Sequence, residues 1–213
     1  MGFLTCGIDY DMIGRVGNHV GRKVKGRNVL SMRPSKSNKP PTQLQLDQRD
    51  KMRVVVQWLR RLNGVINEGF KDYDAAMSQM NAAVSLNLKE AVTAVAPFDI
   101  DYPKVALSKG KLDTPPQDPA IDTVTAAKLD YSWLMNTGAT NAKGTDKVNF
   151  VVYNKVKDKF VILRAGAVRS ALAYSLQLPA NFSGDHVQCY ISFVSADGKL
   201  VSDSYFVGDH IVV

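Results

Sequence analysis

Basic side chains are the most concentrated chemical feature of the sequence. Residues 1–40 hold eight lysines and arginines and two acids, so they carry six of the seven net positive charges of the chain. Guanidinium and ammonium groups gathered in this way bind phosphates or carboxylates. The candidate residues for a polyanion or an acidic partner are Arg15, Arg22, Lys23, Lys25, Arg27 and Arg33. A solubilising tail is the alternative interpretation of the same charges.

A second basic group lies in a segment with helical periodicity. At 100° per residue, Arg49, Arg53 and Arg60 fall within about 40° of one another and form a ridge beside the apolar stripe. The ridge either contacts phosphates or an acidic surface, or forms the solvated flank of a helix.

Catalytic and metal chemistry has no comparable pattern. The histidines His19, His186 and His210 form neither HxxxH nor HExxH, so no zinc site is expected. Residues 17–23 lack the spacing and the Ser/Thr of a phosphate-binding loop. The close carboxylate pairs Asp9/Asp11 and Asp99/Asp101 are read as solvated loop residues. We therefore expect a protein that is not an enzyme and that holds no metal or cofactor.

The cysteines and the apolar runs limit the cellular setting. Cys6 and Cys189 are far apart and form no disulfide framework, which favours two idle thiols in a reducing compartment. The sequence shows no signal peptide and no apolar run long enough to span a membrane. Cytoplasmic synthesis is expected, with a virion or another assembly as a final location left open.

Residues 1–41 are predicted to be a basic, glycine-rich extended arm that ends in a linker at Pro40-Pro41. Valines and isoleucines between the glycines are more than a disordered tail needs. They indicate one or two short strands that order on another subunit or on nucleic acid.

Residues 42–112 are predicted to form a helical hairpin followed by a strand. Thr42 and Gln45 match a capping box, and the first helix then runs to about Asn63. A second helix is predicted over 74–92 and a strand over 102–112. The buried stripe of the first helix is predicted to comprise Leu44, Met52, Val55, Val56, Leu59, Leu62 and Ile66.

Residues 113–119 are a proline-rich linker, and residues 120–213 are predicted to form a β-sandwich. About seven short strands separated by turn signals are typical of immunoglobulin or fibronectin-like domains, with a barrel as the alternative. Trp133 is expected in the core. Candidate strands are 121–126, 128–134, 147–154, 160–164, 171–178, 187–194, 200–207 and 210–213, with Asp197-Gly198 as a hairpin turn. The fold class is thus α+β.

Several motifs in combination resemble an uncharacterised family of bacterial proteins of about 210 residues. They are GRVGNHVG, MRPS, PTQLQLDQR, NAAVSLNLKEAV, IDY and SADGKLVSDSYFVG, which begin at Gly14, Met32, Pro41, Asn81, Ile100 and Ser195. The resemblance covers the whole chain but implies no activity and no functional residues. The segment Pro41–Arg49 alone is also similar to segments of phage structural proteins.

Three functions follow from these features. The first is a structural protein that self-associates through its N-terminal arm into a homo-oligomer or larger assembly, such as a virion or filament. The second is a nucleic-acid-binding protein driven by phosphate contacts, without stacking, because Phe3 and Tyr10 lie outside the basic run. The third is a carbohydrate- or protein-binding module, which would need exposed aromatic residues among Tyr131, Tyr153, Tyr174 and Tyr190.

Overall fold

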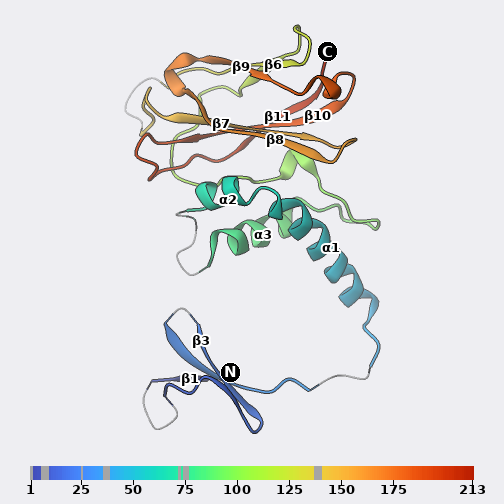
Figure 1. The fold of residues 1–213 in the computed structure, drawn as a ribbon, viewed down its shortest axis with the longest axis vertical. Helices are drawn as coiled ribbons and strands as arrows, with labels where there is room; N and C mark the ends of the chain where they lie inside the picture. Colours follow the sequence, from blue (N-terminus) through green and yellow to red (C-terminus); the bar gives the residue numbers. More distant parts are fainter. Residues whose placement is uncertain are drawn as a thin grey trace. The chain divides into compact units, whose positions relative to one another are not determined.

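The computed structural model describes residues 2–5, 10–24, 26–35, 39–71, 73, 77–136 and 141–213. It has an α+β fold: a small N-terminal sheet, three helices, and two antiparallel sheets in the C-terminal half (Figure 1). The chain divides into two compact units, Met1–Thr42 and Gln43–Val213.

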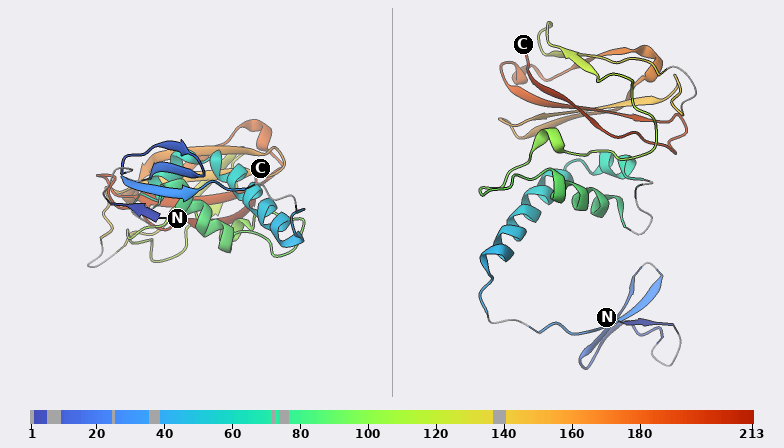
Figure 2. Two further views of the ribbon diagram at one scale, coloured as in Figure 1. Left: turned by 90° about the horizontal axis from the view of Figure 1, so that it is seen from below. Right: turned by 180° about the vertical axis from the view of Figure 1, so that it is seen from behind.

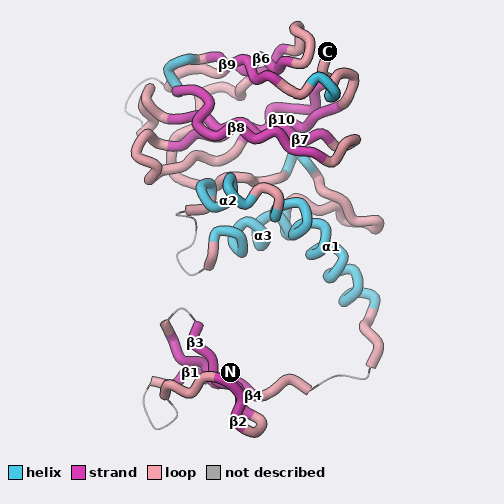
Figure 3. The backbone as a smooth tube through the Cα atoms, viewed as in Figure 1, coloured by secondary structure: helices cyan, strands magenta, loops and turns pink. Residues whose placement is uncertain are grey.

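The N-terminal unit is a four-stranded antiparallel sheet with the strand order β1-β4-β3-β2 (Figure 3). The short strands that the valines indicated are present, but there are four described strands and they pair with one another, so the prediction of an extended arm is wrong. Gly17 and Gly26 have φ values of 56° and 77°, which let the chain reverse tightly after β2 and before β4. The strands are β1 (Gly2–Leu4), β2 (Gly14–Val16), β3 (His19–Val24) and β4 (Arg27–Met32).

Three helices begin the C-terminal unit: α1 (Gln43–Arg60), α2 (Asn63–Gly69) and α3 (Gln79–Glu90). The sequence predicted two, which ended at about Asn63 and began again at residue 74, so it missed α2. A Cβ on Gly69 would lie 2.5 Å from the carbonyl oxygen of Leu107. The absence of a side chain at Gly69 therefore lets the end of α2 pack closely against the backbone at Leu107. Of the predicted second helix, residues 74–76 lie outside the described residues.

The apolar stripe of α1 is buried only in its C-terminal half. Val55 and Leu59 are buried, and so is Leu62 just beyond the helix, as predicted. Leu44 and Met52 are instead 80% and 43% exposed. Figure 1 shows the reason, since the N-terminal half of α1 extends past α2 and α3 and away from the two sheets of its own unit.

The strand predicted over 102–112 is wrong. Tyr102–Lys104 is a 3-10 helix, and the following residues are irregular although Val105 and Leu107 are buried. Side chains and scattered backbone groups of other segments form hydrogen bonds with this backbone in place of a regular partner strand. Asn87 on α3 accepts a hydrogen bond from the Ala106 N–H at 2.9 Å and donates one to its carbonyl at 2.8 Å. Alternating apolar residues here reflect burial under the helices rather than a sheet.

The C-terminal half contains a four-stranded sheet in the order β11-β10-β7-β8 and a three-stranded sheet in the order β5-β6-β9. The helices cover one face of the four-stranded sheet and the three-stranded sheet covers the other, as the right-hand view in Figure 2 shows. The strands are β5 (Ala120–Asp122), β6 (Lys128–Ser132), β7 (Lys147–Asn154), β8 (Lys159–Val168), β9 (Ala173–Gln177), β10 (His186–Val194) and β11 (Tyr205–Ile211).

Strands β7 and β10 lie at the centre of this unit and are buried on both faces. Phe150 and Ile191 point into the core shared with the three-stranded sheet, whereas Val151 and Tyr190 join the core under the helices. Period-two alternation disappears in such strands because neither face meets water. Residues 113–119, predicted to be a linker, lie within this same compact unit.

The strand predictions are confirmed for β5 to β10, with shifted ends for all of them except β7. The last two predicted strands are instead one strand, β11, which starts at Tyr205. The hairpin at Asp197-Gly198 is confirmed, with Gly198 at φ 69°. Trp133 is 4% exposed, as expected for the core, and its Nε1 donates to the carbonyl of Arg169 at 2.7 Å.

Candidate partner-binding surface

The small N-terminal sheet sorts its side chains onto two faces. Residues directly opposite one another on antiparallel strands share a face. Arg15 faces Val20, Arg22 faces Val29, which in turn faces Phe3, and Arg27 faces Val24. Because side chains alternate along each strand, all of these residues lie on the same side of the sheet. We call this side the arginine face, defined by Arg15, Arg22, Arg27, Phe3 and Val24.

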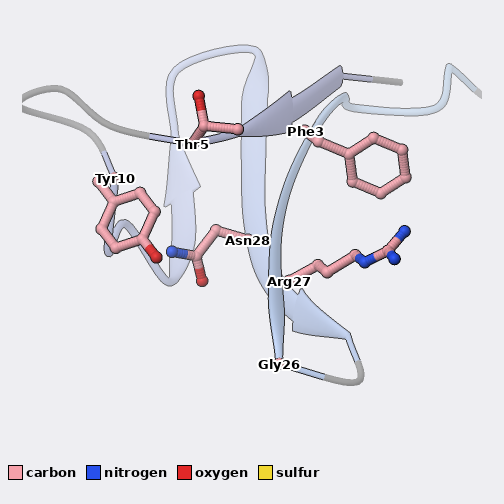
Figure 4. Close-up of a pocket in the computed structure, with 6 residues that line it drawn as sticks. All are labelled: Phe3, Thr5, Tyr10, Gly26, Arg27 and Asn28. Atoms are coloured by element: carbon pink, nitrogen blue, oxygen red, sulfur yellow. The ribbon is translucent and has the colours of Figure 1, made fainter.

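The three arginines of this face are exposed and, in the described part of the chain, form no ion pair. Arg15 Nε donates to the carbonyl of Gly17 at 3.3 Å. The Arg27 guanidinium lies 5.9 Å from the centre of the Phe3 ring, within the range of a cation–π contact. Figure 4 shows Phe3 and Arg27 on one side of β4, with Asn28 and Tyr10 on the other.

The opposite side carries apolar residues. Val16, His19 and Met32 form one row across β2, β3 and β4. Val16 and Met32 are 60% and 73% exposed. A cavity of about 320 Å³ lies here, lined by Met12, Val16, His19 and Leu30. We call this side the apolar face, defined by Met12, Val16, His19, Leu30 and Met32.

The remaining predicted basic residues are dispersed. Lys23 faces Asn28 on the apolar side of the sheet, Arg33 follows β4, and Lys25 lies outside the described residues. The structure therefore brings together three of the six arm residues on one face. The predicted grouping overlooked strand alternation, which sends neighbours such as Arg22 and Lys23 to opposite sides.

The predicted ridge Arg49, Arg53 and Arg60 lies on exposed positions of α1. Arg53 forms an ion pair with Asp50 one turn away, which reduces the positive field of the ridge. The ridge belongs to the C-terminal unit, so it is a separate basic feature from the arginine face.

Phe3 is the residue of the arginine face that the sequence assigned to no site. It lies 24 positions from Arg27 and outside the basic run, yet the pairing of β1 with β4 places it beside that arginine. The usable signal was the short apolar segment before the first acids, which could have been read as an edge strand.

Of the four tyrosines considered for a binding module, three are core residues and the fourth packs against the core. Tyr131 and Tyr190 are each 1% exposed and Tyr153 is 5% exposed. Tyr174 is half-buried and stacks on Phe150, with the ring centres 5.1 Å apart. None offers the broad exposed ring that a sugar or peptide would need. Cys189 is also buried, and burial raises the pKa of its thiol to about 12, which disfavours the reactive thiolate. Cys6 lies outside the described residues.

A buried ion pair at one end of the C-terminal sheets is the other unusual electrostatic feature. The Arg169 and Asp146 side chains are 0% and 1% exposed, with Nε and Oδ2 3.2 Å apart. Arg169 also donates to Asn136 Oδ1 at 2.8 Å and to the carbonyl of Asp113 at 2.9 Å. Burial lowers the pKa of its guanidinium, and its partners keep the charge in place. Through its hydrogen bond to the Asp113 carbonyl, Arg169 links the start of segment 113–119 to the sheets. The charges of Arg169 and Asp146 are paired with each other and are not available to a ligand.

Among the described residues, no cluster of three or more His, Cys, Asp or Glu side chains could hold a metal ion. In that same part of the chain, no helix is both long and apolar enough to cross a membrane.

Comparison with known proteins gives a family and no function. Residues 11–208 match a family of unknown function, DUF6266, and the chain belongs to that family. No curated protein and no solved structure matches the chain. The resemblance of Pro41–Arg49 to phage structural proteins thus gains no support from these comparisons.

Proposed function

We propose that this member of the DUF6266 family is a non-enzymatic assembly subunit, whose N-terminal unit docks onto the same unit of a second copy through the apolar face. The observation that carries the proposal is a separately folded sheet that leaves Val16 and Met32 60% and 73% exposed in one row. In the C-terminal unit, ionic side chains such as Arg61–Asp158 and Lys157–Asp185 are engaged in joining chain segments, which supports a scaffold role.

The size of the N-terminal unit supports a second copy as the partner. Domains near 40 residues depend on disulfides, metals or oligomerisation, because they bury too little apolar surface. Cys6 is the single cysteine of the unit, and its described residues contain no cluster of metal ligands. Oligomerisation is the remaining source of stability. Burial of the apolar face against its own copy would supply it.

The edges of the sheet favour the same kind of contact. Strands β1 and β2 are the edges, each three residues long, and every residue of β2 is exposed. An open edge offers unpaired backbone groups to another chain. Side-by-side pairing centred on Arg15 would place two arginines opposite each other, which is unfavourable. Contact through the apolar face avoids that repulsion.

The two C-terminal sheets support a fibronectin-like sandwich as the scaffold. In antibody constant domains the first, second, fourth and fifth strands form one sheet. Here the fourth strand, β8, pairs with the third, β7, and leaves β5-β6-β9 as the smaller sheet. The arrangement corresponds to a seven-strand sandwich in which one strand has changed sheets, with a helical layer added on the outer face.

Sedimentation velocity of the full chain tests self-association. The N-terminal 42 residues carry eight basic and two acidic side chains, so two such units repel each other at low salt. We expect oligomers that become more populated as salt increases. Deletion of residues 1–36 should leave monomers.

Two matched substitutions locate the interface. Met32→Lys on the apolar face and Val24→Lys on the arginine face add the same charge to exposed strand positions. We expect Met32→Lys to abolish the oligomer and Val24→Lys to retain it, with circular dichroism confirming that both remain folded. A wild-type chain that is monomeric at every salt concentration, or equal losses in the two variants, contradicts the proposal.

A further inference from the structure

We infer that the arginine face binds single-stranded nucleic acid, with phosphates on Arg15, Arg22 and Arg27 and an unpaired base against Phe3. This site is separate from the proposed oligomer contact, because the two occupy opposite sides of the sheet. The sequence alone predicted phosphate contacts without stacking, and the position of Phe3 changes that expectation.

The three arginines follow a diagonal across the sheet. On β3, Arg22 lies midway between Val20 and Val24. Val20 is the cross-strand partner of Arg15 on β2, and Val24 is the cross-strand partner of Arg27 on β4. Diagonal neighbours on antiparallel strands lie about 7–8 Å apart. The guanidinium groups therefore form a row that crosses β2, β3 and β4. Such a row can track successive phosphates of one strand, whereas a compact cluster would hold a single anion.

The local charge balance leaves this row available to an anion. The described acid of the unit is Asp11, which accepts a hydrogen bond from Asn28 on the opposite side of the sheet at 3.4 Å. No described carboxylate competes for the three guanidiniums. Phosphate binding by such groups releases condensed counterions and is strongly weakened by salt.

Phe3 supplies what distinguishes a nucleic-acid surface from a general polyanion surface. Its side chain is 62% exposed and lies beside Arg27 at the end of the arginine row. Bases of single strands stack on exposed aromatic rings of basic sheets, and each stacked base contributes substantially to affinity. Bases in a duplex are already stacked and paired, so they cannot reach the ring. The arrangement thus favours a single strand over a duplex.

An acidic protein segment is the competing partner, since it would pair with the same arginines. An acidic peptide gains no affinity from a neighbouring aromatic ring, so the effect of substituting Phe3 distinguishes the two kinds of partner. The probes are a fluorescent deoxythymidine oligomer, a duplex of equal length, and polyglutamate as competitor.

Fluorescence anisotropy with the full chain is the measurement. We expect the single strand to bind more tightly than the duplex and polyglutamate to compete poorly. Three phosphate contacts on a single strand predict a slope of about −2 for log affinity against log salt. Arg22→Ala should make that slope shallower by about 0.7. Phe3→Leu should weaken binding about 5- to 100-fold and leave the slope unchanged.

Lys23→Ala is the matched control, because it removes the same charge as Arg22→Ala. Lys23 is next to Arg22 in the sequence but lies on the opposite side of the sheet. It should change affinity and slope far less than Arg22→Ala. The inference is overturned by no binding at low salt, by equal effects of these two variants, or by equal affinity for the duplex. It is also overturned if Phe3→Leu has no effect or polyglutamate competes as well as the oligomer, in which case the face serves an acidic protein.

Discussion

Substitution of Arg169 by methionine tests how much the buried ion pair contributes to the C-terminal unit. Arg169 and Asp146 are both enclosed, with side-chain exposures of 0% and 1%. Methionine replaces the aliphatic stem of arginine but leaves the Asp146 carboxylate without its counter-charge. It also removes the hydrogen bonds to Asn136 and to the carbonyl of Asp113.

The expected cost is about 4 kcal/mol, because removal of one partner from a buried pair costs about 3–5 kcal/mol. The penalty comes mostly from the uncompensated carboxylate. Removal of that charge as well, in Asp146→Asn/Arg169→Met, should therefore recover about 1–2 kcal/mol relative to Arg169→Met. A urea dependence of about 2 kcal/mol per molar converts the single substitution into a midpoint lower by about 2 M.

Urea unfolding followed by tryptophan fluorescence measures these differences, since Trp133 donates directly to the carbonyl of Arg169 at 2.7 Å. Asp146→Asn alone completes the double-mutant cycle. If the double variant loses the sum of the two single losses, the residues are not coupled and the reasoning fails. A cost below about 1 kcal/mol for Arg169→Met would refute it as well.

Three further changes probe the same unit. Asn87→Leu removes its bonds to the segment beneath α3 and should cost about 2–3 kcal/mol in thermal unfolding, whereas an unchanged midpoint would show that water replaces the amide. Gly69→Ala should destabilise by about 1–3 kcal/mol because its Cβ would lie 2.5 Å from a backbone oxygen, whereas Gly64→Ala, with nothing nearer than 3.6 Å, should be neutral or stabilising; equal effects would contradict this difference. The hydrogen bond from Arg61 lowers the pKa of Asp158, and this contribution to stability is present above the unfolded value of about 3.9 and is lost as pH falls through the folded value. The deficit of Arg61→Ala should accordingly shrink in acid, and a deficit independent of pH would refute the coupling.

Periodicity and turn chemistry predicted much of the C-terminal half. Strand β7 was predicted with both of its ends, and Trp133 was assigned correctly to the core. These features depend on local apolar runs and on turn residues, which a single sequence displays directly. The irregular segment 105–112 escaped prediction because its backbone hydrogen bonds go to side chains and backbone groups far away in the sequence. Asn87 lies 19 residues from Ala106, and no local pattern announces such a contact.

The candidate surface was predicted in composition but not in geometry. The sequence identified Arg15, Arg22 and Arg27 as basic candidates, and strand pairing then selected these from their neighbours. Phe3 was missed because its relation to Arg27 depends on the pairing of β1 with β4. Linear charge counts cannot tell the two sides of a sheet apart.

The burial of β7 and β10 on both faces has a consequence for synthesis on the ribosome. The core under the helices needs Tyr190, which follows the end of α3 by about 100 residues. At about 5–20 residues per second, the helices emerge roughly 5–20 s before that strand. Strands β7 and β8 emerge within this interval and can cover part of the helices, but the part of the core that Tyr190 completes stays exposed until β10 follows. We therefore expect slow translation between α3 and β10 to lower the yield of folded protein, because exposed apolar surface favours aggregation.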